Sequence, residues 1–429
     1  AGLLGGLMIA LTGPASPVSA SPAAIPLRGV VEGFYGTPWQ QTERLDILTF
    51  CGKQQLNAYI YAPKDDPYHR AKWREPYPPN KMTELAQLIQ TARLQGVRFV
   101  FAVSPGLDIH FTGFAGYKDK LAMEKKLSAM YDLGVRDFAI FFDDIKEKDG
   151  KGQADFLNWL NDHFIKAHPD ISPLITVPTE YFYQDMQENG ILKPYSHDFA
   201  AALESDILVL YTGNQVVSDG ITDAELVAAD QLYGRNLGIW WNYPVTDYVR
   251  NIILQGPVYG LNTSLDSNDL CGIASNPMEH GEASKLALYG VADYTWNIAA
   301  YNPIDNWERG LGELMPKARE AYRTFAIHSC DTETGYRRDE SWETKTFRIG
   351  DWNETEAQAL WAEFDKVEKA PAEIEKGCTN KGLISELTPW LQEFGKLGTR
   401  GKRALELARV YRDGKDDADF WNKYIRNLM

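Results

Sequence analysis

Two neighbouring acids, Asp143 and Asp144, are the residues whose type and spacing most strongly indicate chemistry. They end the apolar run in AIFFDDIKEKDG, residues 139–150. Ionised carboxylates in adjacent positions repel each other, so a strand that buries its first half gains no stability from having both. Two catalytic carboxylates need different protonation states, and one ionised acid raises the proton affinity of its neighbour. We therefore expect the pair to serve acid–base chemistry of the kind that glycosidases perform.

Three other roles compete for this pair. Apolar residues followed by Asp-Asp resemble the magnesium-holding strand of nucleotide hydrolases, but the chain has no Gly-x-x-x-x-Gly-Lys-[Ser/Thr] loop. The acids that follow suggest calcium, yet counting back from Gly150 as the sixth loop position puts Ile145 where the first acid belongs. A helix cap or a solvated turn, the usual place of surface acids, stays open as the third alternative.

Geometry limits which glycosidase mechanism the pair can serve. In the ordinary retaining mechanism two carboxylates lie about 5 Å apart and flank the scissile bond. Adjacent residues of one strand point to opposite faces, so Asp143 and Asp144 do not easily take those two places. The pattern therefore requires a nucleophile other than these aspartates.

Short β-branched or aromatic runs alternate with helical patterns from Arg28 onward. Helices are predicted by apolar residues at three- and four-residue spacing over 82–95, 118–133 and 155–167. Near-continuous apolar strands separated by helices predict a parallel sheet covered on both faces. The eight predicted strands lie in residues 29–36, 57–64, 98–106, 137–145, 174–181, 206–213, 237–244 and 271–277.

A doubly wound open sheet and a closed (β/α)₈ barrel can both hold such strands. The first turn of the open sheet usually carries a phosphate-binding glycine pattern, and Gly33-Phe34-Tyr35-Gly36 is followed by Thr37-Pro38 without a third glycine. The apolar runs also finish in polar residues, and active sites of barrels lie at the carboxyl ends of the strands. We therefore predict a (β/α)₈ TIM barrel over residues 28–300, with the acid pair at its mouth after the fourth strand.

The two ends of the chain differ from the predicted barrel. Residues 1–27 hold an apolar run followed by small residues that end in Val18-Ser19-Ala20, which resembles the core and cleavage site of a secretory signal. This segment has no initiating Met and no basic first region, so we expect the chain to begin inside a signal and the protein to be secreted. Residues 301–429 are predicted to form an all-helical C-terminal bundle, with helices over 311–328, 354–375, 383–413 and 416–428.

Composition narrows the class of partner. A formal net charge of −15 argues against nucleic acid or an anionic membrane, and weakly against a polyanionic polysaccharide. The chain has 12 Trp and 22 Tyr, and flat aromatic faces suit the flat faces of sugar rings. Its four cysteines lack Cys-x-x-Cys spacing, and no later stretch is apolar over the roughly 18 residues of a membrane span. We expect a neutral ligand, no metal, no cofactor and no membrane span.

Six motifs in order resemble glycoside hydrolase family 84, the O-GlcNAcases and related β-N-acetylglucosaminidases, especially its bacterial branch. They are RGVVEGFYGTPW, YAPKDDPYHRAKWREPYP, FFDDI, VPTEY, IWWNYPVTD and SNPMEHGEASKLALYGVADYTWN, between about Arg28 and Asn297. The resemblance implies a retaining enzyme that removes terminal β-linked GlcNAc from a glycoprotein or glycan. It also implies substrate-assisted catalysis, in which the 2-acetamido oxygen of the sugar attacks its own anomeric carbon to give an oxazoline.

The resemblance gives each matching residue an expected role. Asp143 accepts a hydrogen bond from the acetamido N–H, and Asp144 is the general acid and later the base. The expected sugar-binding residues are Gly33 through its backbone, Lys64 at the ring hydroxyls, Tyr181 near the acetamido group, Thr212 and Trp240 along its pocket, Asn242 beside the catalytic centre, Asp247 at the 4- and 6-hydroxyls, and Asn276 at a further hydroxyl. The chain departs from some relatives at Trp241, where an acid is common.

Two alternatives to this function stay open. The first is a catalytically silent, carbohydrate-binding barrel joined to a helical adhesion module, although both acids are present. The second keeps the enzyme but changes the polymer, since some family members were first described as hyaluronidases. The net charge of −15 weakly disfavours such a polyanion.

Overall fold

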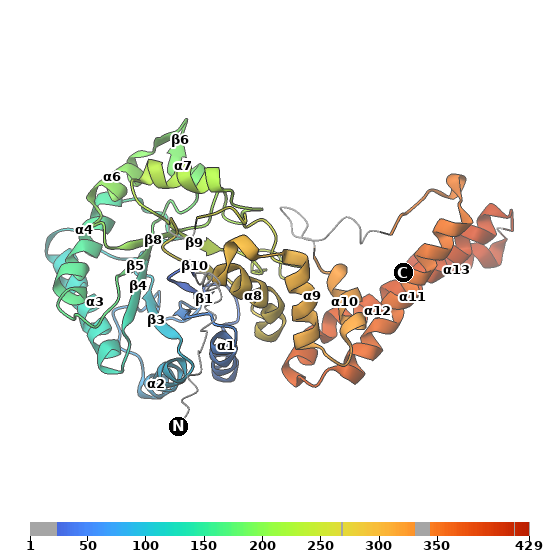
Figure 1. Cartoon of the computed structure of the whole chain (residues 1–429), viewed down its shortest axis with the longest axis horizontal. Coiled ribbons are helices and arrows are strands. Elements are labelled where there is room, and N and C mark those ends of the chain that lie inside the picture. The colour runs from blue at the N-terminus through green and yellow to red at the C-terminus, as the bar shows by residue number, and fades with distance from the viewer. Residues whose placement is uncertain (1–23, 267–268, 331–343, 416, 429) are drawn as a thin grey trace, which may run out of the picture.

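The computed structural model describes residues 24–266, 269–330, 344–415 and 417–428. Most of the predicted signal segment, residues 1–23, lies outside these ranges, so secretion stays a prediction. The molecule has two parts, a barrel ringed by helices and a helical tail that extends away from it (Figure 1). None of the helices in the described ranges is long and apolar enough to cross a membrane.

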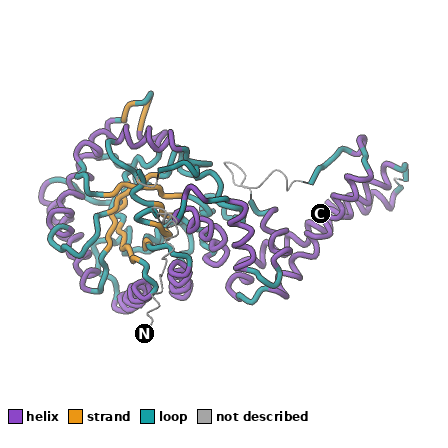
Figure 2. Tube along the Cα trace, viewed as in Figure 1, coloured by secondary structure: helices purple, strands orange, loops and turns teal. Residues whose placement is uncertain are grey.

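A closed barrel of eight parallel strands forms the centre of the first part (Figure 2). The strand order is β1-β10-β9-β8-β5-β4-β3-β2, and the ring closes where Arg28 of β1 pairs with Ile273 of β10. The predicted TIM barrel is therefore confirmed, and the open-sheet alternative is wrong. The strands are β1 Arg28–Glu32, β2 Ala58–Tyr61, β3 Arg98–Val103, β4 Asp137–Phe141, β5 Ile175–Val177, β8 Leu208–Tyr211, β9 Gly238–Trp241 and β10 Ile273–Ser275.

Helices cover the outside of the barrel because each strand is apolar on both faces. Side chains such as Val31, Ile60 and Phe141 fill the interior of the barrel, while a larger apolar cluster lies between strands and helices. The covering helices are α1 Gln41–Lys53, α2 Pro79–Leu94, α3 Gly113–Asp132, α4 Gly150–Leu160 with a π-helical turn at Asn161–Ile165, α6 Pro194–Ala202, α7 Asp223–Tyr233 and α8 Gly281–Trp296. A short helix α5 (Tyr183–Met186) and a hairpin of β6 (Gln187–Glu188) and β7 (Ile191–Leu192) lie in the loop after β5.

One of the eight strand–helix units departs from the prediction. Between β9 and β10 the described residues form turns and irregular loop instead of a helix. Gln255 anchors this loop in the core, because its carbonyl accepts a hydrogen bond from Trp307 Nε1 at 2.7 Å and its side-chain amide donates to the Ala283 carbonyl at 3.0 Å. Tertiary contacts thus replace the helical hydrogen bonds that the regular pattern led us to expect.

The tail contains long helices, as its periodicity predicts, but the predicted helix over 311–328 is wrong. That stretch forms the end of α9 (Pro303–Leu314) and all of α10 (Arg319–Ile327). Pro316 explains the break, since a proline disfavours the helical conformation of the residue before it and donates no backbone hydrogen bond. The remaining elements are 3₁₀ turns at Ile298–Ala300 and Ile349–Asp351, α11 Glu354–Gly377, α12 Lys381–Arg412 and α13 Ala418–Leu428.

Candidate active site

A pocket of about 360 Å³ opens at the carboxyl ends of the barrel strands. This volume lies near the lower end of the range for ligand pockets, about 300 to 1,000 Å³. Every predicted site residue lies in its wall, which consists of Gly33, Tyr35, Lys64, Asp143, Asp144, Val177, Tyr181, Thr212, Val216, Val217, Trp240, Asn242, Val245, Asp247, Tyr248 and Asn276. The barrel therefore gathers residues that are far apart in the sequence into one cavity.

Asp143 is a buried carboxylate in the wall of this pocket. Its Oδ2 forms an ion pair with Lys64 Nζ, and both side chains are almost wholly inaccessible to solvent. Its Oδ1 is also buried but accepts no hydrogen bond from the residues that the structure describes. A buried carboxylate oxygen without a donor is costly, so this atom is available to a donor on a bound ligand.

Asp144 is exposed beside it and has an uncommon backbone conformation, with φ at 54°. A residue other than glycine in this left-handed region is strained by about 1 to 3 kcal/mol, and such strain clusters at functional sites. Its Oδ2 accepts a hydrogen bond from the Tyr35 hydroxyl and its Oδ1 from the Tyr181 hydroxyl, each at 2.8 Å. The carboxylate is thus held from both sides.

The structure corrects two expectations about the acid pair. β4 ends at Phe141, so the aspartates lie in the following loop and not on a strand, and both line the same pocket. The helix-cap alternative also fails for them, because Asp149 caps α4 by accepting a hydrogen bond from the Gly152 N–H at 2.8 Å.

Tyr35 and Arg70 are site residues that the sequence argument missed. Arg70 Nη1 donates to the Tyr35 hydroxyl at 2.9 Å, and Nη2 donates to the main-chain carbonyl of Asp144 at 3.1 Å. Burial and the nearby charge of Asp144 raise the pKa values of Tyr35 and Tyr181, so both phenols stay protonated donors at neutral pH. Both missed residues lie inside quoted motifs, EGFYG and YHR, but only the folded chain brings them to Asp144.

A network of side-chain amides and one indole forms another part of the wall. Asn242 Oδ1 accepts hydrogen bonds from Trp240 Nε1 at 2.8 Å and from Asn276 Nδ2 at 3.0 Å, while Asn276 Oδ1 accepts from the Gly33 N–H at 3.3 Å. A β-carbon on Gly33 would lie only 2.4 Å from Cζ2 of Trp240. Glycine at this position therefore lets the indole close over β1, and Trp240 also packs edge-on against Phe141.

Two further polar residues complete the predicted set. The Thr212 hydroxyl donates to the Gln215 carbonyl at 2.6 Å, which fixes the orientation of its side chain. Asp247 Oδ2 accepts from the Tyr35 N–H at 2.8 Å, and burial raises the pKa of this carboxyl. Trp241 packs in the outer apolar cluster and not with Trp240 inside the barrel.

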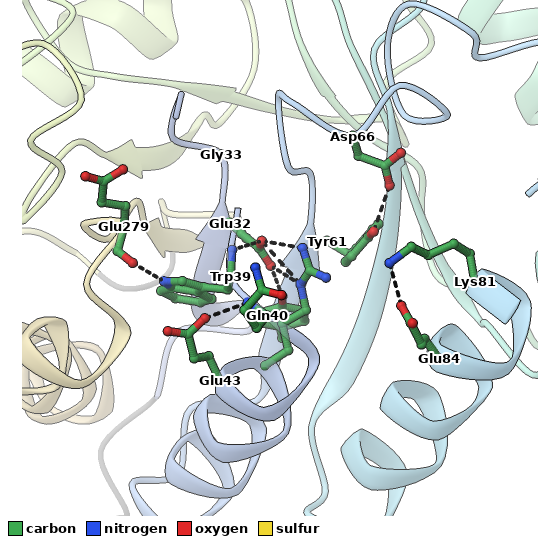
Figure 3. A network of polar contacts seen from close by, with 12 residues as sticks. Glu32, Gly33, Trp39, Gln40, Glu43, Tyr61, Asp66, Lys81, Glu84 and Glu279 are labelled. Carbon is green, nitrogen blue, oxygen red and sulfur yellow. Dashed lines mark hydrogen bonds and ion pairs between the residues drawn. The ribbon is translucent and has the colours of Figure 1, made fainter. Parts of the chain in front are cut away.

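A buried network behind the pocket fixes the loop that carries Gly33 and Tyr35. Glu32, at the end of β1, forms an ion pair with Arg44 at 2.8 Å and accepts hydrogen bonds from the Tyr59 hydroxyl and, at 3.2 Å, from the Trp39 N–H. Figure 3 shows the Trp39 indole directed from this network toward Glu279, whose carbonyl accepts its Nε1–H at 3.1 Å. Both ends of the loop are therefore held by buried contacts.

The described residues contain no group of three or more His, Cys, Asp or Glu side chains arranged to hold a metal ion. The apolar part of the wall, Val177, Val216, Val217 and Val245, also escaped the sequence argument. Valine is a common residue of barrel strands, so its type alone does not indicate a ligand pocket.

Comparison with known families agrees with this geometry. A family model described as beta-N-acetylglucosaminidase matches residues 28–327, and a second, described as hyaluronidase post-catalytic domain-like, matches residues 344–427. The chain belongs to glycoside hydrolase family 84. The first match of this family 84 chain continues beyond the barrel through α9 and α10, and the second covers α11 to α13.

The family 84 chain is also similar to individual relatives and solved structures. It is 33% identical to the protein O-GlcNAcase of Mus musculus over 291 residues, which are 65% of this chain and 30% of the relative. The chain thus spans less than a third of the curated relatives that it matches. The structure of CpGH84B superposes with a TM-score of 0.88 at 38% identity, covering 94% of this chain and 72% of that one. A mutant of the Thermobaculum terrenum O-GlcNAc hydrolase gives a TM-score of 0.82 at 27% identity, covering 94% and 88%.

Proposed function

We propose that the chain is a retaining exo-β-N-acetylglucosaminidase that removes terminal β-linked GlcNAc, as in O-GlcNAc, from a glycoprotein or glycan. One observation carries the proposal: a buried carboxylate with one unpaired oxygen, Asp143, adjoins a second carboxylate, Asp144, that two phenols orient in the same pocket. The names of the relatives, O-GlcNAcase and O-GlcNAc hydrolase, support this choice of substrate.

Asp143 orients the nucleophile, which the substrate itself carries. Its buried Oδ1 accepts the acetamido N–H, and this contact turns the carbonyl oxygen toward the anomeric carbon. As the oxazoline ring closes, positive charge develops at the acetamido nitrogen, and the adjacent carboxylate stabilises it in a site largely free of water. Because the nucleophile is already attached, up to about 7 to 11 kcal/mol of the cost of a bimolecular encounter is avoided when the geometry is ideal.

Asp144 handles the proton. It protonates the oxygen of the departing aglycone, and in the second step it takes a proton from the water that opens the oxazoline. Tyr35 and Tyr181 hold its carboxyl group in place, and Arg70 fixes its backbone. The anomeric configuration is retained because both steps invert the same carbon.

The rest of the pocket recognises the sugar. Trp240, Thr212 and Tyr181 surround the acetamido group, Asn242 and Asn276 form the amide wall beside Gly33, and Asp247 and Lys64 bind ring hydroxyls. A volume of about 360 Å³ suits a single sugar residue, which supports removal of terminal units. Lys64 also pairs with Asp143, so it links hydroxyl binding to the orienting carboxylate.

A chromogenic β-N-acetylglucosaminide assay tests the proposal. The wild-type chain should hydrolyse the substrate, whereas Asp143→Asn should lose most turnover and keep modest binding of GlcNAc. Configuration at the anomeric carbon can be followed by NMR during the reaction, and an inverted first product would exclude the oxazoline route. Binding of GlcNAc without any hydrolysis by the wild type would leave the silent sugar-binding alternative, and preferential cleavage of hyaluronan fragments would favour the hyaluronidase alternative.

A further inference from the structure

The helical tail contacts the barrel next to the candidate active site, and α12 makes this contact. Trp390 Nε1 donates a hydrogen bond to the Asn251 carbonyl at 3.2 Å. The Trp390 ring also packs edge-on against His280, with ring centroids 5.0 Å apart. Asn251 follows β9 and His280 follows β10, so one half-buried side chain of the tail bridges two loops on the mouth side of the barrel.

A second residue of α12 caps a barrel helix. Glu386 Oε2 accepts the Ala283 N–H at 2.8 Å, and Oε1 accepts the Glu282 N–H at 3.2 Å. These are free donors of the first turn of α8, whose own N-cap, His280, forms no side-chain capping bond. The start of α8, only a few residues after Asn276 of the pocket, is therefore completed by the tail.

Asn251, which the Trp390 bond holds, lies in the same short segment as Asp247. Both residues belong to one pair of consecutive turns, because the Val249 N–H donates to the Thr246 carbonyl at 3.0 Å and the Ile252 N–H donates to the Val249 carbonyl at 3.4 Å. On its inner side, this segment presents Asp247 to the pocket. On its outer side Asn251 is exposed, and its carbonyl is held by the Trp390 N–H of the tail.

We propose that the tail is a working part of the catalytic unit, in which Trp390 is a positioning residue for Asp247. Trp390 holds segment 246–252 from outside. This segment then holds the Asp247 carboxylate, which contacts the sugar hydroxyls. The inference rests on the proposed function, in which Asp247 binds those hydroxyls. Displacement of a binding group by about 1 Å is enough to lower catalytic efficiency by up to 10²-fold, so a remote support of this kind has measurable consequences.

Trp390→Ala in the full chain tests this role. We expect kcat/KM on a β-N-acetylglucosaminide to fall about tenfold, mainly through a higher KM, because hydroxyl binding is lost in both the ground state and the transition state. Trp361→Ala is the matched control: Trp361 is another partly exposed tryptophan of the tail, on α11 and 42% exposed, and its replacement should leave both constants unchanged. An equal loss in the two variants would overturn the proposal.

A double-mutant cycle separates positioning from general damage to the fold. In an Asp247→Asn background, Trp390→Ala should cost less than about twofold, since the group it positions is already altered. The same fold-loss in both backgrounds would contradict the inference. If Trp390→Ala does not fold, Trp390→Phe keeps a ring for His280 but lacks the N–H donor, and it should show a smaller loss with the same coupling. An inactive wild type would instead refute the proposed function itself.

Discussion

Aromatic side chains surround a cavity in two regions of the molecule, the mouth of the barrel and the outer end of the tail. The tail cavity is the larger, about 670 Å³ against about 360 Å³, and its wall includes Trp352, Tyr411, Phe420, Trp421 and Tyr424. Four of these rings pack on one another, as in the pair Phe420 and Trp421 with centroids 4.9 Å apart. The fifth, Trp352, donates its indole N–H to Glu354 Oε2 at 3.0 Å, an acceptor outside the wall of the cavity. At the mouth, by contrast, the hydroxyls of Tyr35 and Tyr181 and the indole N–H of Trp240 donate to carboxylate and amide oxygens of residues that themselves line the pocket.

Neither aromatic content nor volume therefore distinguishes the candidate active site from the tail cavity. None of the described residues that line the tail cavity is an acid, whereas the mouth brings three carboxylates together. Burial and charge at the mouth are arranged around Asp143 and Asp144, at the cost of a left-handed backbone at Asp144. The abundance of tryptophan, which suggested a sugar ligand, is therefore only partly explained by the pocket.

The largest effect on activity is expected from a change in the acid pair. Asp144→Asn should lower kcat/KM by about 10³-fold on a substrate with a poor leaving group, because general acid catalysis is removed. On an aryl glycoside with an activated leaving group the loss should be far smaller. Steady-state kinetics on both substrates measure the difference, and equal losses would refute the assignment of Asp144 as the acid.

Asp149→Asn is the matched control for that experiment. Asp149 lies in the same loop, but its carboxylate caps α4 through the Gly152 N–H, and an asparagine side chain can make the same bond. Activity on both substrates should therefore stay within about twofold of the wild type.

Gly33→Ala tests how closely the mouth is packed. The new β-carbon would lie 2.4 Å from the Trp240 indole, so the pocket wall at Trp240 must shift. We expect kcat/KM to fall by up to about 10²-fold, since small displacements of binding groups are costly. In the tail, a β-carbon at Gly312 of α9 would meet nothing nearer than the flexible Arg319 side chain at 3.7 Å, so Gly312→Ala should leave activity unchanged and slightly raise Tm. Full activity of Gly33→Ala would show that the close approach is unimportant.

Tyr35→Phe removes one donor to Asp144 and keeps the ring. We expect kcat/KM to fall about tenfold, the effect of about 1.4 kcal/mol for a hydrogen bond to a charged group. Tyr424→Phe, in the tail cavity, is the parallel change and should leave kcat and KM as they are. A loss in Tyr424→Phe as large as that in Tyr35→Phe would erase the distinction between the two regions.

The junction between the regions gives the smallest expected effect, a change in the pH dependence of stability. Burial raises the pKa of Glu386 from its ordinary value of 4.5 to about 7 in the folded chain. The folded state then holds this proton more tightly than the unfolded state, so the Glu386 contribution to the free energy of unfolding declines as pH rises from 4.5 to 7 and is constant above. Glu386→Gln should remove this pH dependence, so the fall in Tm between pH 4.5 and 7 should be about 2 °C smaller in the variant than in the wild type. Calorimetry between pH 4.5 and 8 measures it. Parallel profiles for variant and wild type would contradict it.

Much of the architecture could be predicted because it depends on local patterns. Apolar runs of strand length between amphipathic helices indicate a parallel barrel, and polar residues at their carboxyl ends indicate where its mouth lies. The residues predicted to bind the sugar all line that mouth, although their individual roles stay proposals. The periodicity over 311–328 predicts a single helix, whereas Pro316 within that stretch accounts for the observed break.

What the sequence alone determined is most of the elements and the motifs that end them, because these depend on neighbours within a few residues. The tertiary structure alone decided which of those side chains meet: Lys64 with Asp143, Tyr35 with Asp144, and Trp390 with the loop after β9. The widest of these three contacts joins residues 139 positions apart. Closure of the barrel and docking of the tail create them, since no local pattern records which distant partner a buried polar group will find.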